Sequence, residues 1–436
     1  MRETMRLEMG TFPITEATFG PRTELDGTRL VIDHDELAAL VLENGFFRRV
    51  RIEIVSPGES ARIIHLLDAI EPRIKVEGPG ETFPGFLGSV ETVGEGRTHR
   101  LGGVAVMQSA EIPGRGKGGL LMVREGIVDM TGPGAAYSPF SQTINIVLTL
   151  ELEPNFSDEE YDRTIRLAGL KAARYLARTT VDRRAPQYRT YDLTISCPAL
   201  PRVVYVHQIQ SQGTFARTFF YGKPLDHLIP TLVHPNELLD GALVSGNYAY
   251  QSMKTPTWLH GNNPVIEQLY DRHGRDWNFV GVILSRGHFY GISEKQHSAN
   301  HVAKLARMWN ADGAMITWEG GGNSIIEAML TIQALERAGI KTTAISYELG
   351  GADGTGTPLL LYSVPEADAL VSCGTYERPL RLPSVKRVVG GRTIRCDPAK
   401  GGHHLPAHQS LQLDTSLQMY CGTNQVGFGR RRGIDF

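Results

Sequence analysis

The stretch AMITWEGGGNSIIEAMLTIQALERAGIKTTAISYEL, Ala314 to Leu349, alternates between two kinds of pattern. Its first six residues are mostly apolar, as in a short buried strand, and a glycine-rich turn follows them. A helix is predicted next, with Ser324 and Glu327 as its capping box and Gly339 at its end. The apolar face of this helix consists of Ile325, Ala328, Met329, Ile332 and Leu335. A second apolar segment completes the pattern, which predicts a βαβ unit of a parallel sheet.

The neighbouring sequence repeats this alternation of strand and helix. FVGVIL, residues 279–284, is apolar throughout, as expected of a strand that is covered on both faces. The helix after it carries Val302 and Ala306 on one face, and ALVSCG, residues 369–374, is a further strand. Residues 200–436 are therefore predicted to form a Rossmann-like, mostly parallel α/β domain.

The first 190 residues have a different texture, in which short strands are separated by turn clusters. One helix is predicted to begin at Ser157, with Glu160 completing a capping box. The polar stretch at residues 178–192 marks a domain boundary. The fold class is thus mixed α/β, with a β-rich α+β N-terminal domain at 1–190 and the Rossmann-like α/β domain at 200–436. The predicted N-terminal strands are RLVID at 29–33, RRVRIEIV at 48–55, GGVAVMQS at 102–109 and TINIVLTLEL at 143–152.

Composition excludes several classes of function. The net charge of the 436 residues is −2, so nothing in the charge balance points to nucleic acid or to an anionic membrane surface. No apolar run reaches the roughly 18 residues of a membrane helix, and the N-terminus has no signal-peptide core. Four cysteines in a chain of this length do not form a disulfide framework, so a cytoplasmic location is expected.

Gly241 to Pro264, GALVSGNYAYQSMKTPTWLHGNNP, resembles the self-cleavage region of a known proprotein family. The family comprises the component B proproteins of glycine, sarcosine and betaine reductases, and the D-proline reductase proprotein is related to it. Matching text occurs in the same order along almost the whole chain. Three of these pieces are EGIVDMTGPGAAYSPFSQTINI at 125–146, NNPVIEQLYDRHGRD at 262–276 and CGTNQVGFG at 421–429.

The resemblance implies a mechanism in which the proprotein cuts itself at a cysteine that becomes a pyruvoyl group. The carbonyl of that group condenses with a substrate amine and withdraws electrons from the carbon–nitrogen bond. A selenocysteine or cysteine on a separate subunit then attacks the carbon. In this chain Tyr248 stands at the position aligned with the pyruvoyl-forming cysteine.

Residue chemistry limits what this position can do. Pyruvoyl formation needs a β-hydroxyl or β-thiol that attacks the preceding carbonyl and is then eliminated. The oxygen of Tyr248 lies across an aromatic ring and cannot leave from Cβ, whereas the hydroxyl of Ser252 is chemically competent. Three readings follow. The chain stays uncut, or it is cut at Gln251–Ser252 and Ser252 supplies the pyruvoyl, or the alignment is misplaced and another site is used.

We therefore predict a component B-like subunit of a multi-subunit reductase that is unprocessed at Tyr248. The reaction is reductive carbon–nitrogen cleavage of a small amine or an N-substituted amino acid, within a homo- or hetero-oligomer. One alternative is a non-catalytic scaffold or substrate-binding subunit of a partner thiol or selenol enzyme. Another is a divergent enzyme that uses a metal.

Polar residues near the aligned position are the candidate site. His260 can act as a general acid or base, and the turn after residue 318 offers backbone N–H groups to a carboxylate. The predicted catalytic residues are Asn247, Tyr248, Ser252 and His260, and the predicted substrate-binding residues are Asn262, Asn263, Glu319, Gly321, Gly322 and Asn323.

The cysteines and histidines near the C-terminus do not predict a zinc site. Cysteine and histidine are the common zinc ligands, but here their spacing matches no standard zinc motif, and Pro406 interrupts any helix between two of the histidines. A polar loop is the preferred reading, and no metal site is predicted. The residues concerned are Cys396, His403, His404 and His408.

Overall fold

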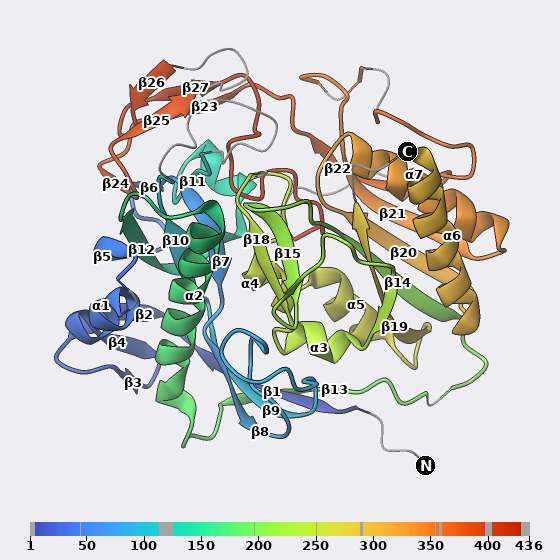
Figure 1. Ribbon diagram of the computed structural model, residues 1–436, viewed down its shortest axis with the longest axis horizontal. Helices are drawn as coiled ribbons and strands as arrows, with labels where there is room; N and C mark the ends of the chain where they lie inside the picture. The colour runs from blue at the N-terminus through green and yellow to red at the C-terminus, as the bar shows by residue number, and fades with distance from the viewer. Residues whose placement is uncertain are drawn as a thin grey trace.

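The computed structural model describes residues 5–43, 45–112, 125–195, 197–249, 251–287, 291–353, 355–356, 360–396 and 403–428. Over these residues the fold is mixed α/β, with many strands, mixed sheets and few helices, as the sequence predicted (Figure 1). No described helix combines the length and the apolar character that crossing a bilayer requires.

The largest sheet has six strands, and the predicted apolar segments at 279–284 and 314–319 are among those that contribute to it. Every neighbouring pair in it is parallel except the antiparallel pair at one edge, between β17 and β19. In spatial order the strands are β17 (Thr231–Val233), β19 (Asn278–Gly287), β14 (Arg202–Gln210), β20 (Gly313–Trp318), β21 (Lys341–Glu348) and β22 (Leu370–Thr375).

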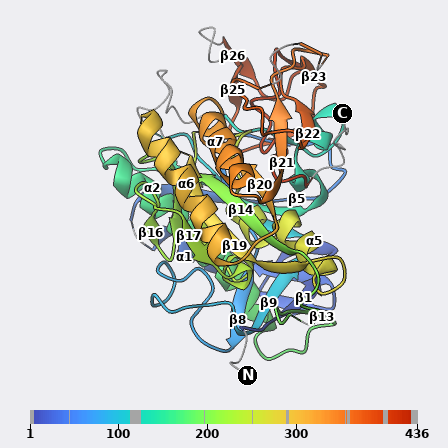
Figure 2. The same cartoon turned by 90° about the vertical axis from the view of Figure 1, so that its right-hand side faces the viewer.

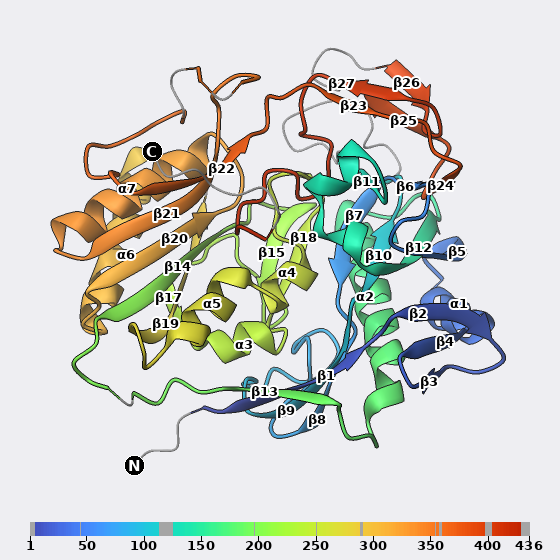
Figure 3. The same cartoon turned by 180° about the vertical axis from the view of Figure 1, so that it is seen from behind.

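Helices cover both faces of this sheet, which explains why its central strands are largely buried. Helices α6 (Ile292–Met308) and α7 (Asn323–Arg337) lie side by side over one face (Figure 2). Helices α3 (Pro235–Leu239) and α5 (Pro264–Arg272) pack against the other, with α4 (Thr257–Gly261) close by (Figure 3). The Rossmann-like description of this region stays a prediction.

The two predicted capping boxes have different outcomes. The box of Ser157 and Glu160 is confirmed at the start of α2 (Asp158–Ala177). The box of Ser324 and Glu327 is wrong, because α7 begins at Asn323 and no side chain caps its first turn. Ser324 lies inside the helix, where its hydroxyl donates to Gln210 Oε1 at 3.2 Å.

The N-terminal region is built of smaller sheets. Helix α2 lies against the sheet that contains residues 66–70 and 104–109, and it buries its apolar face there (Figure 1). One sheet has the order β13 (Gln187–Tyr191), β1 (Leu7–Pro13), β9 (Gly96–Gly102) and β8 (Arg73–Glu77), and the next has the order β5 (Phe47–Val55), β12 (Ile144–Leu152), β10 (Val104–Ser109) and β7 (Leu66–Ile70). Beside them lie β2 (Glu16–Gly20), β4 (Arg29–Asp33), β3 (Glu24–Asp26) and α1 (His34–Leu42).

Between the two regions runs a short sheet of β16 (Lys223–Pro224), β15 (Ala216–Phe220) and β18 (Leu243–Asn247). The chain then returns from the six-stranded sheet to the N-terminal region, where β24 (Arg387–Val389) pairs with β6 (Ala61–Ile63), which also pairs with β11 (Val128–Asp129). The C-terminal segments therefore lie over the N-terminal strands (Figures 1 and 3). They form the pairs β23 (Leu380–Leu382) with β27 (Leu411–Leu413) and β25 (Thr393–Cys396) with β26 (His403–Pro406).

This return crosses the predicted division of the chain between residues 190 and 200. The division stays a prediction, but strand pairing and packing join its two sides. A buried guanidinium fixes the return: Arg62 has no exposed surface and makes two hydrogen bonds to Asp129, at 2.6 and 2.9 Å. Its other hydrogen bonds go to the carbonyl oxygens of Ala407 at 2.7 Å, Gln409 at 3.0 Å and Pro383 at 2.8 Å.

Replacement of Arg62 tests whether its hydrogen bonds hold the C-terminal segments on the N-terminal strands. We expect Arg62→Ala to lower the free energy of unfolding by about 3–5 kcal/mol, because Asp129 is left buried without its counter-charge. Denaturant titration measures the loss. The matched control is Arg29→Ala, whose ion pair with Glu16 is half-exposed, and it should change stability by less than about 1 kcal/mol. Equal losses of unfolding free energy in the two variants would contradict this role of Arg62.

Candidate functional site

The segment that follows β18 runs through the interior between the two regions. Tyr248, Gln251, Ser252 and Lys254 are all buried, with at most 3% of their surface exposed. Burial of so many polar side chains in one connecting segment is unusual, because each must find partners to offset its lost hydration. The sequence-predicted position therefore lies in a polar interior and not in an exposed loop.

Tyr248 fills space at this position. Its ring centroid lies 6.2 Å from that of Phe215, and the Nζ atom of Lys254 lies 5.7 Å from it. Burial raises the pKa of the Tyr248 hydroxyl well above its usual value. That hydroxyl has no hydrogen-bond partner among the described residues. Tyr248 thus stays protonated at neutral pH, and its oxygen is a buried donor without an acceptor.

Lys254 and Asp68 place two opposite charges in this interior. Their Nζ and Oδ1 atoms are 3.8 Å apart, and Lys254 also donates to the carbonyl oxygen of Leu67 at 2.6 Å. Asp68 accepts from the backbone N–H of Thr257 at 3.1 Å and from its hydroxyl at 2.6 Å. Burial raises the pKa of Asp68 and lowers that of Lys254, although each charge favours the other.

Sequence reasoning missed Asp68. It lies on β7 of the N-terminal region, in the buried strand LLDAI, about 180 residues before the segment it contacts. The signal was present, because an aspartate within an apolar strand must find a partner.

Glu319 is the second carboxylate of the interior, and it follows β20 directly. Its two oxygens accept from the backbone N–H groups of Gln210 at 2.7 Å and Thr255 at 2.5 Å. Burial raises the pKa of Glu319 to about 7, against the opposing effect of these hydrogen bonds. Glu319 was predicted to bind substrate. The structure places it in the interior, where it links three segments of the chain.

A row of side chains continues from Glu319. His260 Nε2 lies 4.0 Å from Glu319 Oε1, and His260 Nδ1 lies 3.3 Å from His207 Nε2. His207 Nδ1 in turn lies 3.0 Å from the hydroxyl of Tyr205, which accepts from Asn263 at 3.2 Å. Burial lowers the pKa of His207 to about 3 and that of His260 well below its usual value. Both imidazoles are therefore neutral at pH 7, and Glu319 is the member whose pKa lies nearest neutrality.

The remaining predicted substrate residues lie around this row. Glu319 begins a turn whose next residue, Gly320, adopts φ of +76° and donates its N–H to the carbonyl oxygen of Met253 at 2.9 Å. Asn262 accepts from Arg100 at 2.6 Å, and Asn263 caps α5. These contacts are structural. A substrate role for the whole set stays a prediction: Asn262, Asn263, Glu319, Gly321, Gly322 and Asn323.

The C-terminal segment closes the interior from another side. The backbone N–H of Cys421 donates to the carbonyl oxygen of Gln251 at 2.9 Å. Thr423 donates to the carbonyl oxygen of Ser252 from its N–H at 3.2 Å and from its hydroxyl at 2.7 Å. Burial raises the pKa of the Cys421 thiol, so that no thiolate forms near neutrality. The two peptide groups flanking Ser252 are thus held by residues about 170 positions away.

The C-terminal histidines lie elsewhere. His404 and His408 are exposed, and the side chains of Cys396 and His403 lie outside the described residues. Over the described part of the chain, no group of three or more histidine, cysteine or acidic side chains could hold a metal ion. Zinc at these positions stays untested, as does any role for Asn247, which is buried at the end of β18.

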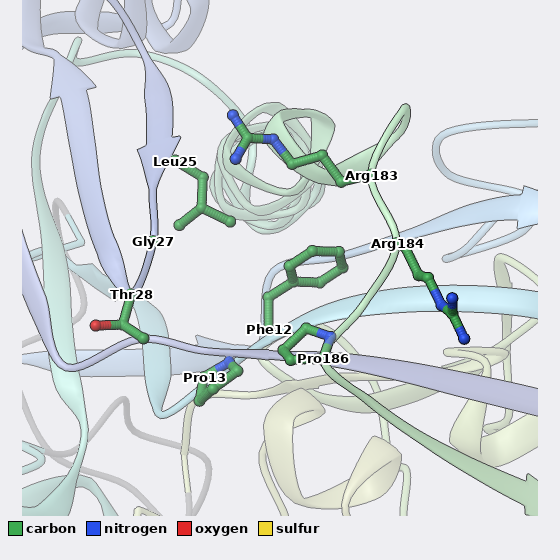
Figure 4. Close-up of a pocket in the computed structure, with 8 residues that line it drawn as sticks. All are labelled: Phe12, Pro13, Leu25, Gly27, Thr28, Arg183, Arg184 and Pro186. Carbon is green, nitrogen blue, oxygen red and sulfur yellow. The ribbon is translucent and has the colours of Figure 1, made fainter.

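Pockets on the surface are distinct from this interior. One of about 370 Å³ surrounds Phe12 and is bordered by Leu25, Arg183 and Arg184 (Figure 4). The side chain of Arg184 points away from the Phe12 ring (Figure 4). The described residues that line it include no carboxylate, histidine or cysteine, so it offers no acid–base pair.

Comparison with known proteins gives one consistent result. The family model of glycine/sarcosine/betaine reductase component B subunits matches residues 5–432. The chain is 37% identical to the glycine reductase complex component B subunits alpha and beta of Acetoanaerobium sticklandii, over 98% of this chain and 99% of that protein. It is 38% identical to the sarcosine reductase complex component B subunit alpha of Peptoclostridium acidaminophilum, over 95% and 96%.

A more distant relative is the D-proline reductase proprotein of Acetoanaerobium sticklandii, 21% identical over 82% of this chain and 57% of that protein. No solved structure matches this chain.

The raised pKa of Glu319 predicts how stability depends on pH. Between about pH 4.5 and 7 the folded state holds a proton that the unfolded state has released, so stability falls as pH rises through this window. We expect Glu319→Gln to remove this contribution. The unfolding free energy of the variant relative to the native protein should rise by about 3 kcal/mol from pH 4.5 to pH 8.

Denaturant titration across this pH range measures the difference. The exposed Glu16→Gln serves as the control and should show no such trend. A constant difference between Glu319→Gln and the native protein would show that the Glu319 carboxyl is not perturbed.

Proposed function

This chain belongs to the family of glycine/sarcosine/betaine reductase component B subunits, and we propose that it is a component B-type subunit of a multi-subunit reductase. Its substrate is a small amine or an N-substituted amino acid whose carbon–nitrogen bond is cleaved reductively. The observation that carries the proposal is the buried set of ionisable groups at the family's self-cleavage region. Its members are Asp68, Lys254, His260, Glu319 and Cys421.

Glu319 and His260 suit the proton transfer that an amine leaving group requires. A carboxyl with a pKa of about 7 both donates and accepts protons near neutral pH. The neutral imidazole of His260 is 4.0 Å away and can relay a proton toward His207. These groups would supply the acid–base part of the reaction.

The nucleophile belongs to a partner subunit in this proposal. A thiolate or selenolate is needed to attack carbon, and Cys421 is buried with a raised pKa. Cys373 is also buried, and Cys197 is half-buried and remote from the site in sequence. A separate chain that carries the reactive cysteine or selenocysteine fits these three cysteines, whose side chains the structure describes.

Tyr248 does not fit a pyruvoyl group. Its side chain cannot undergo β-elimination, and it is fully enclosed. A pyruvoyl group therefore cannot form from residue 248. We propose that the chain stays uncut at residue 248 and that it binds and positions the substrate.

Cutting at Gln251–Ser252 is the second candidate for processing, and one hydrogen bond favours it. The Gln251 carbonyl, which Ser252 Oγ would attack, already accepts a hydrogen bond from the N–H of Cys421 at 2.9 Å. Such a donor polarises a carbonyl for attack. The attack would give an ester, and elimination would release the Gln251 carboxylate and leave dehydroalanine. Hydrolysis would then consume one water, release ammonia and leave a pyruvoyl at residue 252.

Reconstitution tests the main proposal. The purified chain, combined with the other components of a glycine-type reductase and a dithiol reductant, should release ammonia or an amine from glycine, sarcosine or betaine. Omission of this chain should abolish release. We expect Glu319→Gln to reduce kcat by about 10²-fold or more and to remove the ionisation near pH 7 from the pH profile. Full activity without the chain would contradict the proposal.

Intact mass separates the two candidates for processing. Under denaturing conditions, with and without a carbonyl-reactive hydrazine, we expect one unlabelled chain of 48.0 kDa. Two fragments that meet at Gln251–Ser252, with the C-terminal one labelled, would contradict the uncut chain. In that case Ser252→Ala should abolish cutting, whereas Ser245→Ala, the matched control on β18, should leave it unchanged.

A further inference from the structure

Lys254 and Asp68, the ion pair of the interior, are placed for a covalent bond between their side chains. Both side chains are at most 1% exposed, and Lys254 Nζ lies 3.8 Å from Asp68 Oδ1. Asp68 lies on β7 of the N-terminal region, and Lys254 belongs to the segment that follows β18. Because both reacting groups belong to the chain, a reaction between them needs no opening to solvent.

Burial favours the uncharged form of each group. It lowers the pKa of Lys254 and raises the pKa of Asp68, against the attraction between the two charges. An unprotonated amine is a nucleophile, and the hydroxyl of a protonated carboxyl group can leave as water, whereas an ammonium and a carboxylate do not react with each other. The interior therefore favours the reactive forms of the pair, which water would suppress.

Two aromatic rings enclose the lysine amine. Lys254 Nζ lies 5.7 Å from the ring centroid of Tyr248 and 5.4 Å from that of Tyr420. Both tyrosines are fully buried. The residue that cannot form a pyruvoyl group thus helps to keep water away from the amine.

The hydrogen bonds around the pair suit a product amide as well as the separate groups. Lys254 Nζ donates to the carbonyl oxygen of Leu67 at 2.6 Å, and the N–H of an amide can keep this bond. Thr257 donates to Asp68 from its hydroxyl at 2.6 Å and from its N–H at 3.1 Å. Such donors polarise the carboxyl carbon for attack, and one of them can remain bound to the amide oxygen. Condensation would also remove two charges that are costly to bury.

Glu319 is the group that can transfer the protons. Burial raises the pKa of Glu319 to about 7. Glu319 accepts from the N–H of Thr255, the residue after Lys254, at 2.5 Å, and its charge acts on the Lys254 amine. A carboxyl group with this pKa can take a proton from the amine and give one to the leaving hydroxyl.

We propose that Lys254 and Asp68 form an isopeptide bond within the folded chain. Lys254 Nζ attacks Cγ of the protonated Asp68, so that a carbon–nitrogen bond forms and the bond from Cγ to the hydroxyl breaks. The hydroxyl leaves as water with a proton that Glu319 relays from Nζ. One water is released, and no oxidant or reductant is consumed. This reaction goes beyond the proposed function, because it needs neither a substrate nor a partner subunit.

Mass spectrometry of the denatured full-length protein tests the bond. We expect the chain to be lighter than its sequence mass by one water molecule. Trypsin should release residues 63–73 joined to the peptide that contains Lys254. The full sequence mass would overturn the proposal, and so would a water deficit confined to one linear peptide. Because the bond would also join the fragments of a chain cut at Gln251–Ser252, hydrazine labelling then reports cutting.

Three variants assign the roles. We expect Lys254→Met to restore the sequence mass, because methionine keeps an apolar side chain and removes the amine. Glu319→Gln should slow the appearance of the water deficit after synthesis by about 10²-fold or more. Lys295→Met is the matched control and should keep the deficit. Lys295 and Glu327 form another buried pair, at 3.6 Å, but the neighbouring Arg286 is a cation that cannot accept a proton.

Each variant has an outcome that contradicts its role. A water deficit that persists in Lys254→Met, or that disappears in a folded Lys295→Met protein, would overturn the assignment to Lys254. An unchanged rate in Glu319→Gln would overturn the role of Glu319 and retain the bond. If Lys254→Met does not fold, the presence or absence of the joined tryptic peptides in the native protein still decides the proposal.

Discussion

The burial of Asp68, Lys254 and Glu319 in one interior is the constraint on which the rest of the structure depends. Each charge loses its hydration there, and the loss is offset only if protein groups replace the water. The groups that do so come from distant segments: Thr257 for Asp68, the Leu67 carbonyl for Lys254, and the Gln210 and Thr255 N–H groups for Glu319. The N-terminal sheet and the six-stranded sheet are therefore held in one arrangement by polar contacts, and apolar packing surrounds them.

The C-terminal segment completes this arrangement in the same manner. Cys421 and Thr423 bind the peptide carbonyls of Gln251 and Ser252, while Arg62 holds the preceding strands on the N-terminal sheet. Each contact joins residues more than 160 positions apart. If this segment moved away, the buried carbonyl groups would lose their hydrogen bonds, which is energetically costly. The site is thus a property of the whole chain, which agrees with a family match that extends from residue 5 to residue 432.

Local sequence signals predicted the parts of the fold that local physics determines. The apolar strands at 279–284 and 314–319 and the Ser157 cap lie where the patterns placed them. The prediction of Ser324 as a helix cap was wrong, because a glycine turn leads into α7 and the Ser324 hydroxyl donates to Gln210 instead. The neighbourhood of Tyr248 and His260 came from family resemblance, and Glu319 came from the strand–turn–helix pattern, whereas Asp68 was missed. The partners of Asp68 lie far away in the chain, so no spacing rule reveals them, although an acid inside an apolar strand is itself a signal.

Tyr248 determines how the buried charges of the interior contribute to the proposed reaction. In the uncut chain that we propose, no electrophilic carbonyl activates the amine by condensation, so the contribution to carbon–nitrogen cleavage comes from binding, orientation and proton transfer. The interior offers proton transfer at Glu319, whose pKa lies near 7.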